Sequence, residues 1–463
     1  MTAFNASAYS VEQWRELEQK VFNGDSAALT AVRDYARHNN LPPVPFLVAC
    51  AQYAIAATPS SVMLDAGLGP GTANMFVCLM DAPGMGKDRL MKYVRRAMQV
   101  SCNGKPLEPV PASVSSGEGV ITSMIEHDEK GSPIVEDGAA MPGAPVLFGV
   151  SEVGLLGNLM KRQGNTLRQN LLSVYSGNPL GINNRQDKMY LAQDSYRGCL
   201  WVGAQPDTAG ILLEGGDDGL RHRFVFVELE DPLLDIDREY PEAQLLPVEI
   251  PKRLVDGKPF TFPDEVCLYS RMMLKQKLKH GAAVAPVGHA DFTTAKLAMG
   301  IALLRSQSSA SQHDYDSAKA IMDYSAAVIA RCERHQSAKR IEQKAERRGE
   351  DEQAAELAAE AKEKRQQATL SRITQKIVDW LNVDDGQLPE PETWMQYEQT
   401  LASRDRKKAR GIRDQLARDN VVRINGDYVE RGPAFHHVGG CPILCVRRLG
   451  LQVIRESVGV RHS

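Results

Sequence analysis

The chain has 463 residues, of which 43% are hydrophobic and 24% charged, and its formal net charge is −3. This length exceeds what one core organises, so we expect two to four domains of ordinary globular composition. The near-neutral charge excludes a uniformly basic chain, so any nucleic-acid surface must be local. No apolar run approaches the ~18 residues of a membrane span. The N-terminus has no basic, apolar signal and the eight cysteines are scattered, so a cytoplasmic location is expected.

In the first half of the chain, the pattern of apolar residues changes near residue 66. Residues 1–65 have helical patterns broken by a Pro-rich stretch, which predicts a helical N-terminal segment. Residues 66–235 alternate short apolar runs with helical patterns, which is typical of an α/β layer with parallel strands. The four apolar runs are NMFVCLM (74–80), PVLFGV (145–150), GCLWVGA (198–204) and RFVFVEL (223–229).

The second half divides into four parts. Residues 236–336 are predicted to be mainly helical. Residues 337–367 consist almost entirely of Ala, Glu, Lys, Arg and Gln, which suits an exposed helix with i,i+4 ion pairs or a flexible linker. A compact module is expected over 368–435, followed by a tail at 436–463.

A glycine-rich turn, DAPGMGKD (81–88), follows the first apolar run and precedes an amphipathic helix. Strand, glycine-rich turn, lysine and helix form the phosphate cradle of P-loop NTPases. Backbone N–H groups there bind phosphate oxygens, and Lys87 would reach the β- and γ-phosphates of ATP. The alternative is a surface turn that happens to contain GMGK. The expected ATP-binding residues are Pro83, Gly84, Met85, Gly86, Lys87 and Asp88.

The motif departs from GxxxxGK[ST] at both ends. Asp81 replaces the first glycine, and Asp88 replaces the Ser or Thr that binds Mg²⁺. The run at 145–150 is followed by Ser151 and Glu152, and Glu152 is placed to polarise an attacking water. Ser151 stands where an Asp usually assists Mg²⁺. The carboxylate and the hydroxyl have therefore exchanged positions, and Asp88 and Ser151 would both remain available to the metal.

Three further polar residues follow or precede the later apolar runs. Gln205 ends the third run, where a sensor residue contacts the γ-phosphate and the attacking water, although it would serve equally as a strand-end cap. Arg221 and Arg223 precede the fourth run. An arginine there commonly reaches the γ-phosphate bound by a neighbouring subunit. The alternative is an ion pair within the chain, with Asp217 or Asp218.

The ordered set GMGK, VSSGEGVITSM, LFGVSEVGLL, SVYSGNPL, VGAQPD and DDGLRHRFVF resembles the helicase-like ATPase domain of primase–helicases encoded by phages and integrated mobile elements. That family lies near the AAA+ and superfamily III helicases, which act as hexameric rings on DNA. The resemblance covers residues 45–235. It implies an AAA+-like P-loop ATPase core, ATP and Mg²⁺ as cofactors, and a homo-oligomer, expected to be a hexamer, around single-stranded DNA. Only a short helical segment precedes the core, so a primase would be a separate protein.

Helicases of this kind carry DNA-contacting loops between the strand that precedes the catalytic glutamate and the strand that precedes the sensor residue. In this chain the interval lies between the runs at 145–150 and 198–204. In this interval the sequence GINNRQDKMYL (181–191) predicts a β-hairpin that turns near Asn183 and Asn184. Arg185 and Lys188 would then point into the pore, where basic groups follow the phosphate backbone without base readout. An ordinary solvated hairpin is the alternative.

The C-terminal module predicts three helices and a hairpin. The helices are expected at 369–382, 392–403 and 403–420, with Ser403 as the N-cap of the third. The hairpin at 421–431 turns on Asn425-Gly426. This is the order of a winged helix-turn-helix. The third helix is unusually basic, which is typical of a recognition helix in duplex DNA, although a protein-binding winged helix with solvated charges is the alternative. The basic residues on its outer face are Arg404, Arg406, Lys407, Lys408, Arg410 and Arg413.

Together these features predict an ATP-dependent DNA helicase or replication initiator of a phage or mobile element, acting as a ring on DNA. The alternatives are an ATP-binding, DNA-binding regulator with a degenerate nucleotide site, and an antiphage-defence ATPase without helicase activity.

Overall fold

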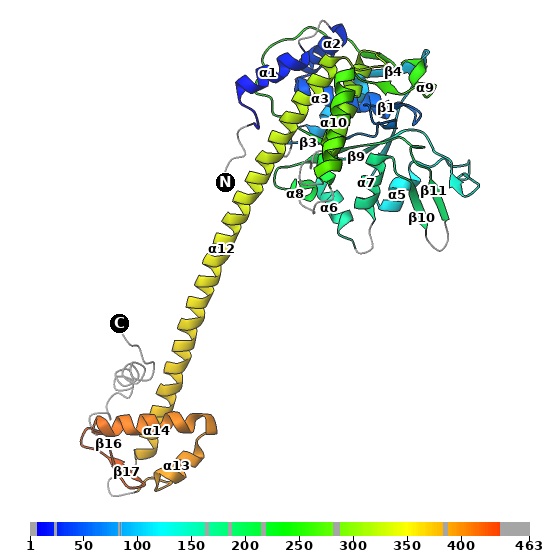
Figure 1. Cartoon of the computed structure of the whole chain (residues 1–463). Coiled ribbons are helices and arrows are strands. Elements are labelled where there is room, and N and C mark those ends of the chain that lie inside the picture. The colour runs from blue at the N-terminus through cyan, green and yellow to red at the C-terminus, as the bar shows by residue number, and fades with distance from the viewer. Residues whose placement is uncertain are drawn as a thin grey trace. The chain divides into compact units, whose positions relative to one another are not determined.

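The computed structural model describes residues 7–22, 26–81, 84, 86–162, 166–183, 188–213, 219–280, 288–382 and 388–435. The chain forms two compact units, Met1–Arg340 (unit 1) and Ile341–Ser463 (unit 2), shown in Figure 1. No helix in the described ranges combines the length and apolar character needed to cross a bilayer.

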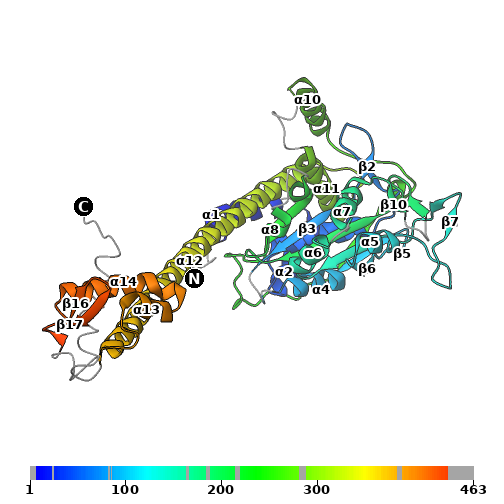
Figure 2. The same cartoon turned by 90° about the horizontal axis from the view of Figure 1, so that it is seen from below.

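A parallel sheet forms the centre of unit 1 (Figures 1 and 2). Every neighbouring pair of its strands runs parallel. The order across the described part of the sheet is β13 (Phe224–Glu228), β3 (Phe76–Met80), β12 (Gly198–Ala204), β9 (Val146–Val150) and β6 (Val110–Ser113). Every residue of β3, β12 and β13 is buried, as expected for parallel strands covered on both faces.

Helix α3 (Pro43–Ala56) packs across the sheet and is buried along its whole length. A helix that is apolar on all sides belongs in a core rather than at a surface. Its one long polar side chain, Gln52, donates through Nε2 to Met75 O at 3.1 Å and to Leu200 O at 2.8 Å. Helix α11 (Gly288–Leu304) packs on α3, where Gly300 lies directly against Ala51.

The remaining helices of unit 1 connect or cover these elements. They are α1 (Val11–Phe22), α2 (Ala27–His38), α4 (Lys87–Ala97), α5 (Gly117–Thr122), α6 (Val153–Met160), α7 (Leu167–Ser176), α8 (Gly210–Leu213), the 3₁₀ helix η1 (Leu220–Arg223), α9 (Lys252–Val255) and α10 (Asp264–His280).

Smaller sheets in the described part of unit 1 surround the central one. The first has the order β15 (Phe260–Thr261), β1 (Met63–Asp65), β2 (Gly71–Thr72). The second has the order β14 (Leu246–Glu249), β4 (Met98–Cys102), β5 (Lys105–Pro106). The third has the order β10 (Leu180–Asn183), β11 (Lys188–Leu191), β8 (Ala139–Ala140), β7 (Val135–Glu136).

The prediction of an α/β fold with a parallel sheet is confirmed, and the four apolar runs correspond to β3, β9, β12 and β13. The edge strand β6 was not predicted, because its sequence VPAS contains a proline and is largely exposed. The structure groups the predicted segments 1–65, 66–235 and 236–336 in one unit. The reason is that α3 and α11 supply core residues to the same hydrophobic cluster as the sheet.

Helix α12 (Gln312–Leu381) begins in unit 1 and ends in unit 2. The charged segment 337–367 is helical and forms part of it, and the predicted helix at 369–382 is its last part. Unit 2 adds α13 (Trp394–Thr400), α14 (Ser403–Arg418), β16 (Val422–Asn425) and β17 (Tyr428–Arg431). The side chains of Ile377, Trp394 and Ile412 meet in its separate core.

Two local details of unit 2 differ from the sequence prediction. Asn425 pairs with Tyr428, so the two-residue turn is Gly426-Asp427, one residue later than predicted. Gly426 has a φ of 64°, a left-handed conformation that glycine adopts readily. Ser403, which resembles an N-cap, is instead the first residue of α14 and follows the cap residue Ala402.

Candidate functional site

The strand order reverses between β3 and β12, which are neighbours in the sheet. From β3 the chain goes to the far edge strand β6, whereas from β12 it goes to β13 at the opposite edge. In open parallel sheets, ligands bind at the carboxyl ends of the strands where the order reverses in this way. Asp81, Ser151 and Gln205 follow β3, β9 and β12, so three predicted segments meet at this edge.

The glycine-rich turn leads directly into α4. Gly84 and Gly86 have φ values of 83° and 93°, which favour glycine, and Gly86 caps the helix. Ala82, Pro83 and Met85 lie outside the described residues. The helix begins at Lys87, so the positive end of its dipole and the N–H groups of its first turn lie at the glycine-rich turn.

Lys87 extends back over the turn toward the sheet. Its Nζ donates to the backbone oxygen of Asp81 at 3.2 Å. Asp81 itself is buried, and its N–H donates to Ala204 O at 3.1 Å, which ties the turn to the end of β12. A β-carbon on Gly203 would lie 3.2 Å from Lys87 Cδ and would collide with Ser151 O. Because Gly203 has no side chain, Lys87 and Ser151 can both lie close to β12.

Asp88 and Ser151, predicted from separate motifs, are in contact. Ser151 Oγ donates to Asp88 Oδ1 at 2.8 Å, and both side chains are exposed. Glu152 follows as the exposed N-cap residue of α6. One carboxylate and one hydroxyl are thus close enough to share a ligand, and a second carboxylate is adjacent in sequence.

The loop after β12 is held by α12. Gln205 is half-buried, and its backbone oxygen accepts from the N–H of Thr208 at 2.9 Å. Asp207 accepts from Lys339 Nζ at 2.8 Å and contacts His335 Nε2 at 2.8 Å. These two hydrogen bonds, from Lys339 first, hold the pKa of the Asp207 carboxyl below its ordinary value.

The two arginines of η1 lie in different environments. Arg221 is 43% exposed and pairs with Glu333 of α12 at 3.1 Å. Arg223 is only 7% exposed; it contacts His289 Nε2 at 3.1 Å and lies over the ring of Tyr175. An ion pair within the chain does form at Arg221, but Asp217 and Asp218 lie outside the described residues. Of the two, only Arg221 presents its side chain to solvent.

Burial keeps the histidine beside Arg223 neutral. The pKa of His289 is lowered from 6.5 to about 4, mainly because burial disfavours its charged form, and then because Arg223 lies beside it. The neutral Nε2 can accept a hydrogen bond from the guanidinium. The surroundings of Arg223 therefore depend on the protonation state of His289.

Strands β10 and β11 pair in the antiparallel direction, with Asn183 opposite Lys188, and residues 184–187, on which most of the predicted turn falls, lie outside the described residues. Arg185 lies outside the described residues, as does the side chain of Lys188. The hairpin does not stand alone, because β11 pairs in parallel with β8 through Tyr190 and Ala139.

Three of the six predicted DNA-binding residues of α14 are held within unit 2. Arg406 donates to Leu401 O and Gln399 O. Arg410 binds the Glu398 carboxylate in a bidentate pair, from Nε to Oε2 at 2.9 Å and from Nη2 to Oε1 at 2.7 Å. Arg413 pairs with Asp414 and lies over the Trp394 ring. Arg406 and Arg413 are half-buried, whereas the side chain of Arg410 is 63% exposed although it binds Glu398 of α13.

The other three, Arg404, Lys407 and Lys408, are exposed and make no ion pair with any described residue. They share one side of α14 with Gly411, where a β-carbon would meet nothing within 4 Å. We call Arg404, Lys407, Lys408 and Gly411 the α14 outer face. It is basic, and at Gly411 it allows close approach to the helix backbone.

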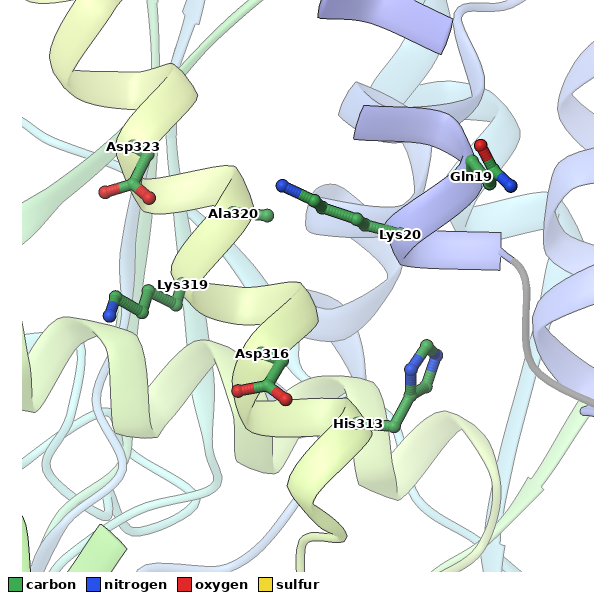
Figure 3. A pocket seen from close by; sticks show the side chains of 7 residues that line it. All are labelled: Gln19, Lys20, His313, Asp316, Lys319, Ala320 and Asp323. Carbon is green, nitrogen blue, oxygen red and sulfur yellow. The ribbon is translucent and has the colours of Figure 1, made fainter. Parts of the chain in front are cut away.

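A shallow depression elsewhere on unit 1 has a different chemistry (Figure 3). It has a volume of about 550 Å³ and lies between α1 and the start of α12. Lys20 and Lys319 alternate there with Asp316 and Asp323, so neither anions nor cations are favoured. The residues that line it are Gln19, Lys20, His313, Asp316, Lys319, Ala320 and Asp323.

Within the described ranges, no group of three or more His, Cys, Asp or Glu side chains could hold a metal ion. A cation at Asp88 and Ser151 would therefore need ligands from elsewhere, such as phosphate oxygens. Neither a scan against protein-family models nor a search of curated proteins found a match to this chain.

Sequence reasoning missed Gly203 and the α12 residues that hold the neighbouring loops. Glu333, His335 and Lys339 lie in a helix whose charges look solvated in the sequence, so no motif marks them. Gly203 stands in the run VGA, where its packing role is visible only once Ser151 and Lys87 are placed.

Proposed function

We propose that this protein is an ATP-dependent DNA helicase or replication initiator of a phage or mobile element, which assembles as a homo-oligomeric ring, a hexamer. The observation that carries the proposal is the meeting of the glycine-rich turn, Lys87 and the Asp88–Ser151 pair at the edge where the strand order reverses. These are the donors and acceptors that a nucleoside triphosphate requires at such an edge.

The turn and the start of α4 would bind the phosphates of ATP through backbone N–H groups, and Lys87 would reach the β- and γ-phosphates. A phosphate is charged and is therefore a stronger partner for the ammonium group than the backbone oxygen of Asp81, to which Lys87 Nζ donates. Bound Mg²⁺ would neutralise phosphate charge. Asp88 would supply a carboxylate to the ion and Ser151 a hydroxyl, both oxygen ligands that suit it.

Two residues would act on the γ-phosphate from the sheet edge. Glu152, exposed at the start of α6, would orient and polarise the attacking water. Gln205, at the end of β12, would contact that water or the phosphate. Arg221 is our candidate for the arginine that reaches a neighbouring subunit's phosphate, because its side chain is exposed whereas that of Arg223 is buried.

DNA would contact two parts of the chain. The β10–β11 hairpin, with Arg185 and Lys188, would follow single-stranded DNA inside the ring. Unit 2 has the order helix, helix, helix and hairpin, which supports a winged helix. We propose that its α14 outer face binds duplex DNA through Arg404, Lys407 and Lys408.

The test is ATP hydrolysis with and without single-stranded DNA, together with unwinding of a forked duplex. Lys87→Ala should abolish hydrolysis and weaken nucleotide binding about 10- to 150-fold, since a charge-assisted contact contributes about 1.5–3 kcal/mol to binding. Lys92→Ala is the matched control, because Lys92 is exposed on the same helix, away from the turn. Undiminished hydrolysis by the Lys87 variant would contradict the proposed nucleotide site.

A DNA-binding regulator that binds ATP without hydrolysing it is the second candidate. The observation that favours it is the exchange of positions at Asp88 and Ser151, which are hydrogen-bonded to each other. Nucleotide binding without hydrolysis or unwinding, in the presence of DNA, would select this candidate. An antiphage-defence ATPase would hydrolyse ATP but would not unwind a forked duplex.

A further inference from the structure

Helix α10 is held to unit 1 at its first turns and leaves much of its length exposed. Val266 is buried, Cys267 lies against Gly67, and Arg271 Nε donates to Gly67 O at 3.0 Å. Figure 2 shows the helix projecting from the body of unit 1. Its large exposed apolar side chains are Leu268, Tyr269, Met272, Leu274 and Leu278.

One side of this helix combines apolar and basic groups. Helical spacing aligns three large apolar residues with three basic ones, and all six are exposed. Between 271 and 280 the chain has four basic residues and no acidic one. We call this side the α10 face; it consists of Leu268, Arg271, Met272, Lys275, Leu278 and Lys279. An exposed apolar patch with a charged rim is typical of a protein-binding surface.

A second projecting segment of unit 1 has the opposite charge. Residues 126–137, around β7, contain five acidic residues, all exposed, and a single lysine. Glu136 is opposite Ala139, and Ala139 is opposite Tyr190, so Glu136 and Tyr190 share one face of their sheet. Tyr190 is 48% exposed. We call residues 126–137 together with Tyr190 the acidic arm. It also combines charge with an exposed apolar side chain.

The α10 face and the acidic arm lie apart in the described part of one chain. In Figure 2 α10 and β7 project from unit 1 at separate places. No ion pair among the described residues joins them. The α10 face and the acidic arm both carry exposed apolar side chains, and their charges are opposite. Each is therefore a suitable partner for the other on a second molecule.

We propose that the α10 face of one copy docks on the acidic arm of a second copy. The contact joins two different surfaces, so after pairing the first copy still has a free acidic arm and the second a free α10 face. Such head-to-tail contacts continue until a ring closes or a filament forms. This inference rests on the proposed function, since it names the contact that would build the proposed ring.

The experiment measures the mass of the full chain in solution by sedimentation, at several concentrations and with Mg²⁺ and ATP. The wild-type chain should form closed assemblies. Lys275→Glu with Lys279→Glu reverses the α10 face, and Glu136→Lys with Asp137→Lys reverses the acidic arm. Each pair should weaken association about tenfold or more, because like charges then face each other. A chain that carries all four substitutions should assemble again.

The matched control reverses two lysines in an exposed part of α12, with Lys344→Glu and Lys364→Glu, and should assemble like the wild type. A wild-type chain that stays monomeric at all concentrations would overturn the inference. So would either pair that leaves association unchanged, or a fourfold variant that stays monomeric. Weaker DNA binding by the Lys275 and Lys279 variant, with normal assembly, would identify the α10 face as a nucleic-acid surface instead.

A second readout separates this inference from the proposed function. Binding of a fluorescent ATP analogue is measured on the same preparations, and the α10 and acidic-arm variants should bind it as the wild type does. Nucleotide binding by a chain that never assembles would refute the docking contact alone. Assembly that obeys the charge reversals, in a chain that binds no nucleotide, would refute the nucleotide site alone.

Discussion

Ser151 Oγ donates a hydrogen bond to Asp88 Oδ1 at 2.8 Å, although the two residues are 63 positions apart in the chain. If they serve one metal ion together, their substitutions must be strongly non-additive. Asp88→Ser leaves two hydroxyls and too little negative charge, whereas Ser151→Asp brings two carboxylates together. The double variant restores one of each. We therefore expect it to recover Mg²⁺-dependent ATP hydrolysis that each single variant loses, with a coupling of about 0.5–3 kcal/mol.

The measurement is a double-mutant cycle on hydrolysis at several Mg²⁺ concentrations. Ser123→Asp, on the exposed surface at the end of α5, controls for an added carboxylate elsewhere. Additive losses, or a double variant that is worse than both single variants, would mean that Asp88 and Ser151 do not share a metal ion.

Gly203→Ala should disable the site through packing alone. The added methyl group would collide with Ser151 O and crowd Lys87, and forced packing of this kind typically destabilises by about 1–3 kcal/mol. We expect weaker binding of ATP and a lower free energy of unfolding in urea. Gly154→Ala, in α6, meets nothing within 4 Å and should stabilise by about 0.5–1 kcal/mol. Equal behaviour of the two variants would show that the contact at Gly203 is not tight.

If Arg221 reaches the phosphate bound by a neighbouring subunit, two inactive variants should complement each other in a mixed assembly. Arg221→Ala should bind ATP but hydrolyse it slowly, and an arginine of this kind contributes about 10³–10⁵ in rate. When this variant is mixed with Lys87→Ala, some sites combine an intact Lys87 with a neighbour's intact Arg221. Hydrolysis should therefore recover in the mixture under subunit exchange. A fully active Arg221 variant, or a mixture without recovery, would exclude the role.

Substitutions on the α14 outer face should weaken DNA binding without lowering the stability of unit 2. Changing Arg404, Lys407 and Lys408 to Ala should weaken duplex binding and reduce its log–log salt slope by about 0.9 per lost phosphate contact. The thermal midpoint should stay unchanged, since these side chains are exposed. Arg410→Ala should instead lower the thermal midpoint, because it removes the bidentate partner of the buried Glu398. Binding titrations at several salt concentrations and thermal melts distinguish the two effects.

The lowered pKa of His289 predicts that the free energy of unfolding decreases in mild acid. Its pKa is lowered from 6.5 to about 4 in the folded chain, so the unfolded chain takes up a proton first as the pH falls. This contribution to stability is constant above pH 6.5 and declines between 6.5 and about 4. His289→Gln should flatten that decline by less than about 1.4 kcal/mol per pH unit, since the side chain is only half-buried. Urea titrations across this range test it; identical slopes for both chains would contradict it.

Much of the parallel sheet follows from sequence, because buried strands such as GCLWVGA are continuous apolar runs bounded by turns. The edge strand β6 could not be found in this way, since one exposed side removes the apolar signal. The grouping of Lys87, Asp88 and Ser151 follows from strand ends that share one edge. Periodicity placed the arginines of α14 on its surface, but it could not show that Arg406 and Arg410 bind α13.

Every described side chain from 341 to 366 in α12 is exposed, so no tertiary packing supports this stretch. The cores of units 1 and 2 share no buried residue. Because each unit has its own buried core, we expect heating to produce two separate transitions in calorimetry. Brief protease treatment should cut the chain within 341–366 and release two fragments that each retain their own transition.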